Sequence, residues 1–201
     1  MKMMKQIILF LLMSVFLLIT ACSPPAAGPR NPDVNNEINP SAQTDKFPLT
    51  ADSDQISSEF RDSLFDFSWK LFQESSQNES NVLISPASVY LALGMTCNGA
   101  DTQTRLDMAK ALSASGLSED EFNTACRDYI SILLTKGNKT ELSIGNSIWY
   151  RDGIKVNKDF LQLNSTYFNA VVKGLDFNQP EAVDTINDWA KKETRNTINK
   201  I

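Results

Sequence analysis

The stretch of residues 81–112, NVLISPASVYLALGMTCNGADTQTRLDMAKAL, constrains the fold more than any other part of the chain. Its first four residues predict a short apolar strand. Ser85 and Pro86 then predict a helix start, because serine is a favoured N-cap and proline is tolerated at the first helical position. An apolar helix follows, and Asn98-Gly99 is typical of a left-handed helix end. A second short helix completes the stretch.

Apolar periodicity predicts further helices and two more strands. From residue 56, apolar side chains recur at the spacing of one helical face. Ser118 and Glu121 form a capping box before another helix, and residues 142–150 alternate as a half-buried strand does. The expected helices cover residues 56–71, 86–97, 101–112, 119–134, 158–168 and 180–196; the expected strands cover 81–84, 142–150 and 170–177. The predicted class is α+β, and without a glycine-rich strand-to-helix turn a nucleotide-binding fold is not expected.

The last helix carries a prediction of its own. Pro180 is expected at its first helical position. Its buried side is expected to comprise Val183, Ile186, Trp189 and Ala190. Trp149, in the strand over residues 142–150, is expected to be largely buried like Trp189, between helix and sheet.

Residues 1–21 are expected to be a signal peptide of the lipoprotein type. Lys2 and Lys5 precede an apolar run over residues 7–19, which is too short for a membrane span of ~20 residues. The sequence LITAC, ending in Cys22, is similar to a bacterial lipobox, in which the cysteine receives a diacylglycerol and becomes the new N-terminus. The chain is therefore expected to be exported and lipid-anchored to the cell envelope. The alternative is an ordinary secretory signal and a secreted protein.

Residues 22–51 are expected to be a disordered tether. They hold six of the eight prolines and few large apolar side chains, so they bury too little surface to fold. Such a spacer would hold a domain clear of the membrane. The folded domain is expected over residues 52–201.

Composition excludes several functions. The chain has no histidine, so the sequence rules out a histidine-dependent catalytic triad or a histidine-ligated metal site within it. Its net charge is −5, and loss of the leader would remove two lysines, so nucleic acid is not an expected partner. No cofactor is expected. An exported hydrolase with a carboxylate pair stays a remote alternative, since no clustered acidic motif is present.

Two cysteines and the glycosylation sequons leave alternatives open. Cys97 and Cys126 lie on apolar helical faces and are expected to be buried free thiols, although export makes a disulfide possible. Asn78, Asn138 and Asn164 begin Asn-x-Ser/Thr sequons, which would matter only in a eukaryotic secretory route.

Four ordered patches resemble the serpins, a family of suicide inhibitors of proteases. They are the opening stretch, LSIGNSIWY (142–150), AVVKGLDF (170–177) and INDWAKKETRNTI (186–198). The resemblance covers residues 60–201, less than half of a serpin domain. It implies an incomplete N-terminal portion of the serpin fold, with helices around part of a large central mixed β-sheet. Asn196 stands where the family usually has glycine, and asparagine tolerates the left-handed conformation expected there.

The resemblance implies an inhibitor of serine or cysteine proteases and not an enzyme. In the family, a reactive loop is cleaved and then inserts as a strand into the central sheet. Ser85 and Ser88 would belong to the shutter region beneath that sheet, and the helix over residues 180–196 would yield during insertion. The alternative is that Ser85 is only an N-cap and Ser88 a satisfied helix hydroxyl.

The chain as given is expected to be non-inhibitory. The family's reactive loop lies near its C-terminus, so no reactive-site residue or catalytic residue is named here. The alternative function is a non-inhibitory surface-binding domain on a serpin-like scaffold. A heparin-type polysaccharide is not expected as a partner, because the helix over residues 119–134 begins Glu-Asp-Glu and holds only Arg127 beside Asp128.

Overall fold

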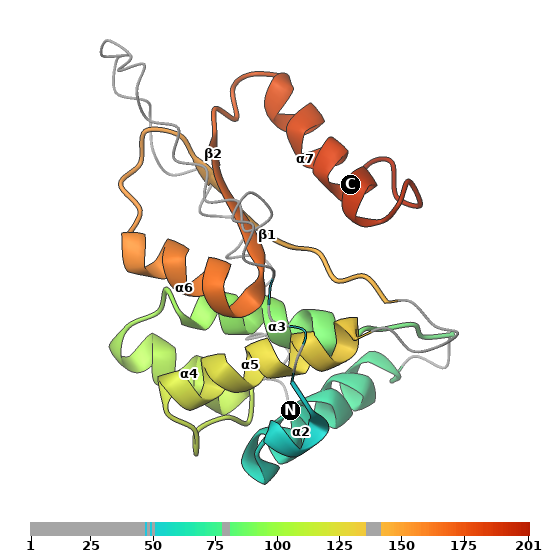
Figure 1. Ribbon diagram of the computed structural model, residues 1–201, viewed down its shortest axis with the longest axis vertical. Helices are drawn as coiled ribbons and strands as arrows, with labels where there is room; N and C mark the ends of the chain where they lie inside the picture. The colour runs from blue at the N-terminus through green and yellow to red at the C-terminus, as the bar shows by residue number, and fades with distance from the viewer. Residues whose placement is uncertain (1–46, 48, 50, 78–80, 136–141) are drawn as a thin grey trace. The chain divides into compact units, whose positions relative to one another are not determined.

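The computed structural model describes most of the chain from Phe47 onward. The described residues are 47, 49, 51–77, 81–135 and 142–201. The elements follow in the order η1 (Ser53–Gln55), α2 (Ser58–Ser75), α3 (Pro86–Cys97), α4 (Thr102–Ala111), α5 (Glu119–Leu134), β1 (Asn146–Arg151), α6 (Lys158–Phe168), β2 (Ala170–Leu175) and α7 (Glu181–Glu193) (Figure 1). The predicted signal peptide, Cys22, most of the tether, Asn78 and Asn138 lie outside the described residues.

Local capping explains where five of these helices begin. In each case the N-cap side chain accepts a hydrogen bond from a backbone N–H of the first turn, which satisfies a donor that has no partner within the helix. These caps of α2 to α6 are Ser57, Ser85, Asp101, Ser118 and Asn157. At Ser118 the reciprocal bond from Ser118 N–H to Glu121 Oε2 measures 2.8 Å, so the predicted capping box is confirmed.

Helix α3 occupies the centre of the helical layer and packs against α2, α4, α5 and α6 (Figure 1). Its inner face carries Tyr90, whose ring meets Phe60 edge-on at a centroid distance of 5.7 Å and Phe67 at 5.3 Å. Tyr90 also contacts Phe122 of α5 at 5.8 Å. Edge-to-face aromatic pairs add to the free energy of burial. This aromatic group joins three helices in one core.

A buried polar contact fixes the rotation of α3 in that core. The Ser63 hydroxyl of α2 lies 2.7 Å from Tyr90 Oη and donates to the carbonyl of Leu112 at 2.9 Å. Burial raises the pKa of Tyr90, so its phenol stays neutral. Because a buried polar group without a partner costs free energy, these bonds favour one orientation of α3 over its rotational alternatives.

Gly94 allows α5 and α6 to approach α3 closely. A Cβ atom at this position would lie 3.1 Å from Phe122 Cε1 and 3.1 Å from Phe168 Cε1. Glycine in a helix interior is unfavourable by itself. Here its small size is needed for two aromatic rings to reach the helix backbone.

Strands β1 and β2 form a two-stranded parallel sheet with α6 as the crossover between them. The register runs from Asn146 opposite Ala170 to Arg151 opposite Leu175. Parallel neighbours require such a crossover, and a helix usually supplies it. The Asn146 side chain closes the unit by donating to the Phe168 carbonyl at 2.8 Å.

The two faces of β1 contact different partners. Ile148 and Tyr150 pack against the hydrophobic core, while Trp149 meets Trp189 of α7 at 5.8 Å. Both tryptophans are of intermediate burial, so they are less buried than the large burial predicted from the sequence. The alternation predicted over residues 142–150 is confirmed within β1, whereas Leu142, which was predicted on the apolar face, is 48% exposed.

The strand predicted over residues 81–84 is not formed. These residues have no assigned secondary structure, and Leu83 is 99% exposed. A strand exists only beside a hydrogen-bonding neighbour, and none of the described residues pairs with this segment. The predicted strand over 142–150 begins later, at Asn146, and the one over 170–177 ends earlier, at Leu175, for the same reason.

Other local predictions are corrected or confirmed by the backbone. Asn98 ends α3 in the right-handed helical region, so the predicted left-handed end is wrong. A Cβ on Gly99 would lie 2.9 Å from Phe160, so packing explains this glycine. Asn196 does adopt a left-handed conformation, with φ 64°. Pro180 is the N-cap of α7 and not its first helical residue, and Val183 is 54% exposed rather than buried.

Substituting Gly94 tests the close packing of α3. We expect Gly94→Val to lower the free energy of unfolding by about 1–3 kcal/mol, because the new side chain would overlap Phe122 and Phe168. Urea denaturation followed by circular dichroism measures it. Gly116→Val is the matched control, since a Cβ there meets no atom within 4 Å. Equal losses for both variants would contradict the packing argument.

Candidate functional site along helix α3

The N-terminus of α3 brings together the two serines singled out from the sequence. Ser85 Oγ accepts a bond from Ser88 N–H at 3.4 Å, and the two hydroxyl oxygens lie 2.9 Å apart. Both residues are exposed. The structure therefore confirms Ser85 as the N-cap and shows that the Ser88 hydroxyl bonds to it. Both hydroxyls keep capacity for a further partner, since each has one proton and two lone pairs.

From these serines an exposed face runs along α3 away from the core. We call it the α3 outer face, and it comprises Ser85, Ser88, Val89, Ala92, Thr96 and Gly99. These residues recur every three or four positions, so they share one side of the helix. The whole helix is uncharged. Small uncharged side chains allow another backbone to approach this face without burying a charge.

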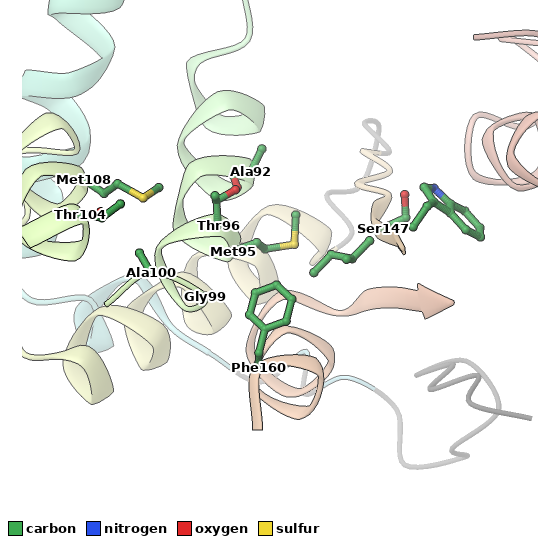
Figure 2. A pocket seen from close by; sticks show the side chains of 11 residues that line it. Ala92, Met95, Thr96, Gly99, Ala100, Thr104, Met108, Ser147 and Phe160 are labelled. Atoms are coloured by element: carbon green, nitrogen blue, oxygen red, sulfur yellow. The ribbon is translucent and has the colours of Figure 1, made fainter. Parts of the chain in front are cut away.

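The C-terminal half of this face opens into a groove of about 570 Å³. Figure 2 shows Met95 of α3 and Phe160 of α6 between Met108 of α4 on one side and Ser147 of β1 on the other. None of the lining residues is charged. The groove is therefore an apolar surface between α3, α4, α6 and the start of the sheet.

Helix α7 is attached through a small contact. Trp189 meets Trp149 edge-on, and a Cβ on Gly145 would lie 3.0 Å from Glu193 Cβ, so the chain before β1 touches the end of α7. The buried Trp189 Nε1–H finds no hydrogen-bond acceptor among the described residues. An unsatisfied buried donor lowers the stability of this contact.

Three asparagine side chains bond to one another where α3, α5 and α6 meet, and sequence reasoning missed them. Asn98 at the end of α3 exchanges two side-chain bonds of 3.0 Å with Asn123 of α5. Asn98 Nδ2 also lies 3.4 Å from Asn164 Oδ1, and Asn164 donates to the Phe160 carbonyl at 2.9 Å. The only sequence signal would have been polar residues on otherwise apolar helical faces.

Asn164 shows why a sequon must be judged in its fold. It begins the sequence Asn-Ser-Thr, but its side chain is fully buried in this group of three asparagines. A glycan could not be attached to this side chain in the folded domain.

The two thiols are buried and unpaired with each other. Cys97 and Cys126 are both free, so the predicted free thiols are confirmed and the disulfide is not formed. Burial raises the pKa of both thiols, and it does so most strongly for Cys126. A raised pKa keeps the reactive thiolate scarce at neutral pH.

The α3 outer face and the groove are the surfaces that the described residues offer for contact with a partner. Among the described residues, no group of histidine, cysteine, aspartate and glutamate side chains is arranged to hold a metal ion. The α3 outer face and the groove carry hydroxyls and apolar groups. Such surfaces can bind and release protein segments.

A family model for serpins, described as serine protease inhibitors, matches residues 62–201. Neuroserpin from Mus musculus is 34% identical over 121 residues, which cover 60% of this chain and 30% of neuroserpin. A serpin-like protein from Methanosarcina acetivorans is 26% identical over 137 residues, covering 67% of this chain and 32% of that protein. The chain thus spans about a third of the length of these relatives.

Solved serpin structures share the fold. The thermophilic serpin tengpin in its latent state superposes with a TM-score of 0.67 at 38% identity, over 73% of this chain and 40% of tengpin. A loop C-sheet serpin polymer gives a TM-score of 0.67 at 37% identity, over 77% of this chain and 40% of that chain. The α+β class and the partial N-terminal serpin fold predicted from the sequence are confirmed.

Thiol labelling tests the burial of Cys97 and Cys126. In a Cys22→Ala variant we expect neither thiol to react with Ellman's reagent at pH 7 in the native protein, because burial protects both and raises their pKa. Both should react after denaturation in urea. Rapid native labelling of Cys126 would contradict the packing of α5 against α3.

Proposed function

The chain belongs to the serpin family, and from this premise we propose that the protein in its complete form, which would carry the family's reactive loop, inhibits a serine or cysteine protease by the loop-insertion mechanism. A protease would cleave an exposed reactive loop and form an acyl-enzyme. The loop would then insert as a strand into the sheet to which β1 and β2 belong. The protein would act as a suicide substrate and not as an enzyme.

In this proposal, strands of the sheet move across the α3 outer face. The observation that carries the proposal is the Ser85–Ser88 hydroxyl pair, exposed at the N-terminus of a helix whose other face is fixed in the core. The pair would exchange hydrogen bonds with strands that separate and close above it. Beyond the serines, Ala92, Thr96 and Gly99 are small and uncharged, so a strand could pass without desolvating a charge.

Helix α7 would be the element that yields. Its contacts with the chain around β1 include the indole pair Trp149–Trp189 and the close approach at Gly145, and only Ala182 and Ala190 of its residues are buried. An indole N–H left without an acceptor favours an equilibrium in which this helix separates at modest cost. By contrast, α3 is held by aromatic packing and by the Ser63–Tyr90 contact.

We also propose that the protein is exported and held at the membrane through a lipid on Cys22. Support comes from the basic, apolar and LITAC segments of residues 1–22. No helix among the described residues has both the length and the apolar character needed to cross a bilayer. A secreted protein without the lipid is the alternative.

Protease trapping is the direct test of the proposed inhibition. The complete protein, including the reactive loop that the family carries, is mixed with a panel of serine and cysteine proteases, and we expect a covalent adduct that survives denaturing electrophoresis. Ser88→Leu should lower the trapped fraction and raise the cleaved fraction, because strand movement over α3 would be impaired. Ser76→Leu, at an exposed position after α2, is the control. Cleavage without any adduct would contradict inhibition and favour a non-inhibitory scaffold.

Membrane fractionation tests the anchor. We expect the wild-type protein in the membrane fraction, and we expect Cys22→Ala either to leave that fraction or to accumulate with its leader uncleaved, because the acylated residue is missing. Mass spectrometry of the N-terminal peptide measures processing and acylation. Wild-type protein found in the cytoplasm with an intact leader would contradict the proposal.

A further inference from the structure

Helix α2 carries an aromatic stripe on the side opposite to the core. Phe65 is 68% exposed, Trp69 53% and Phe72 45%. They stand at positions i, i+4 and i+7, so they share one helical face, and the Trp69 and Phe72 rings lie 6.2 Å apart. The buried residues of α2, Phe60 and Phe67 among them, face the other way. Neighbouring exposed aromatic side chains on a helix mark a contact surface.

We propose that this α2 stripe binds a second copy of the same chain, through a two-fold axis near Trp69 that sets the two α2 helices antiparallel. In that arrangement Phe65 of one copy meets Phe72 of the other, and the two Trp69 rings meet at the axis. The contact is isologous, because each residue pair occurs twice.

The charges beside the stripe are self-complementary in this arrangement. Asp66 and Lys70 lie along the same flank of α2, one turn apart. A two-fold axis at Trp69 keeps the same flanks together and reverses the direction, so Asp66 of each copy comes beside Lys70 of the second copy. Lys70 Nζ donates to the exposed Ser113 Oγ at 3.0 Å, and among the described residues its ammonium group has no acidic partner.

The same charges disfavour a bilayer as the occupant. Helix α2 holds four acidic residues and two basic ones: Glu59, Asp62, Asp66 and Glu74 against Arg61 and Lys70. Helices that lie on membranes are typically rich in lysine and arginine, which attract anionic lipids. An acidic helix is repelled by such a surface. A protein face with both charge signs fits it better.

The size of the stripe sets the strength of the dimer. Aromatic side chains have areas of 150–250 Å² each, so these exposed fractions give roughly 300 Å² of aromatic surface per copy. Stable interfaces bury about 800 Å² per partner. The dimer is therefore expected to be weak and reversible, with a dissociation constant on the order of 100 µM.

Sedimentation equilibrium tests the dimer on the Cys22→Ala protein without its leader, so that no lipid contributes to association. The concentrations run over roughly 10 to 500 µM, which brackets the expected dissociation constant. We expect a monomer at the low end and a dimer at the high end. Trp69→Ser should weaken association by about tenfold or more, since a central tryptophan typically dominates an interface. Leu106→Ser is the matched control, because Leu106 is a similarly exposed apolar residue on α4, and it should leave association unchanged.

A charge exchange tests the geometry of the pair. Asp66→Lys places two lysines together in the dimer and should weaken it about threefold, whereas the double variant Asp66→Lys/Lys70→Asp should restore wild-type association. Thermal unfolding at low concentration separates these effects from helix stability. A monomer throughout the concentration range, or association unaffected by Trp69→Ser, would overturn the proposal. So would binding to phosphatidylcholine vesicles that depends on Trp69, which would assign the stripe to a membrane.

Discussion

The described domain depends on the fixed position of helix α3, which one buried contact and one glycine define. The Ser63 hydroxyl forms hydrogen bonds with the Tyr90 phenol and the Leu112 carbonyl. Because Gly94 has no side chain, the rings of Phe122 and Phe168 can approach the backbone of the helix. Leaving a buried hydroxyl without its partner would destabilise the folded domain by about 1–3 kcal/mol, so α3 has one favourable rotation about its own axis within the core. That rotation decides which residues face outward. The uncharged outer face, with its serine pair, is therefore a consequence of how the inner face is held.

This arrangement gives the domain a rigid part and a loosely held part. Helices α2, α3, α5 and α6 share a continuous core of aromatic and aliphatic side chains. Helix α7 contacts β1 through an indole pair, and it leaves the Trp189 N–H without an acceptor among the described residues. For an inhibitor that works by strand insertion, this contrast is useful. In the proposed mechanism, α3 would keep its position while α7 moved.

The sequence predicted the features that local chemistry decides. The capping box of Ser118 and Glu121, the cap at Ser85 and the left-handed Asn196 depend only on neighbours within a few residues, and each is present. The prediction of a strand at residues 81–84 was wrong, because a strand needs a hydrogen-bonding partner that the local sequence does not contain.

At the candidate site, the contacts among the three asparagine side chains could not be predicted from local sequence either. Asn98 meets Asn123 and Asn164 across 25 and 66 residues, so no local pattern could reveal their contact. The groove itself is likewise built from four separate elements. By contrast, Ser85 and Ser88 could be named from the sequence, because they lie within one helical turn.

Hydrogen exchange of single backbone amides tests the central claim most directly. The account holds that α3 keeps its position and that α7 separates from the rest of the domain. In that case the buried backbone amides of α3, such as those of Leu91 and Met95, exchange only through global unfolding. Amides of α7, such as that of Ala190, exchange through a smaller local opening whose free energy lies well below that of global unfolding. Equal protection of α3 and α7, or faster exchange in α3, would contradict the account.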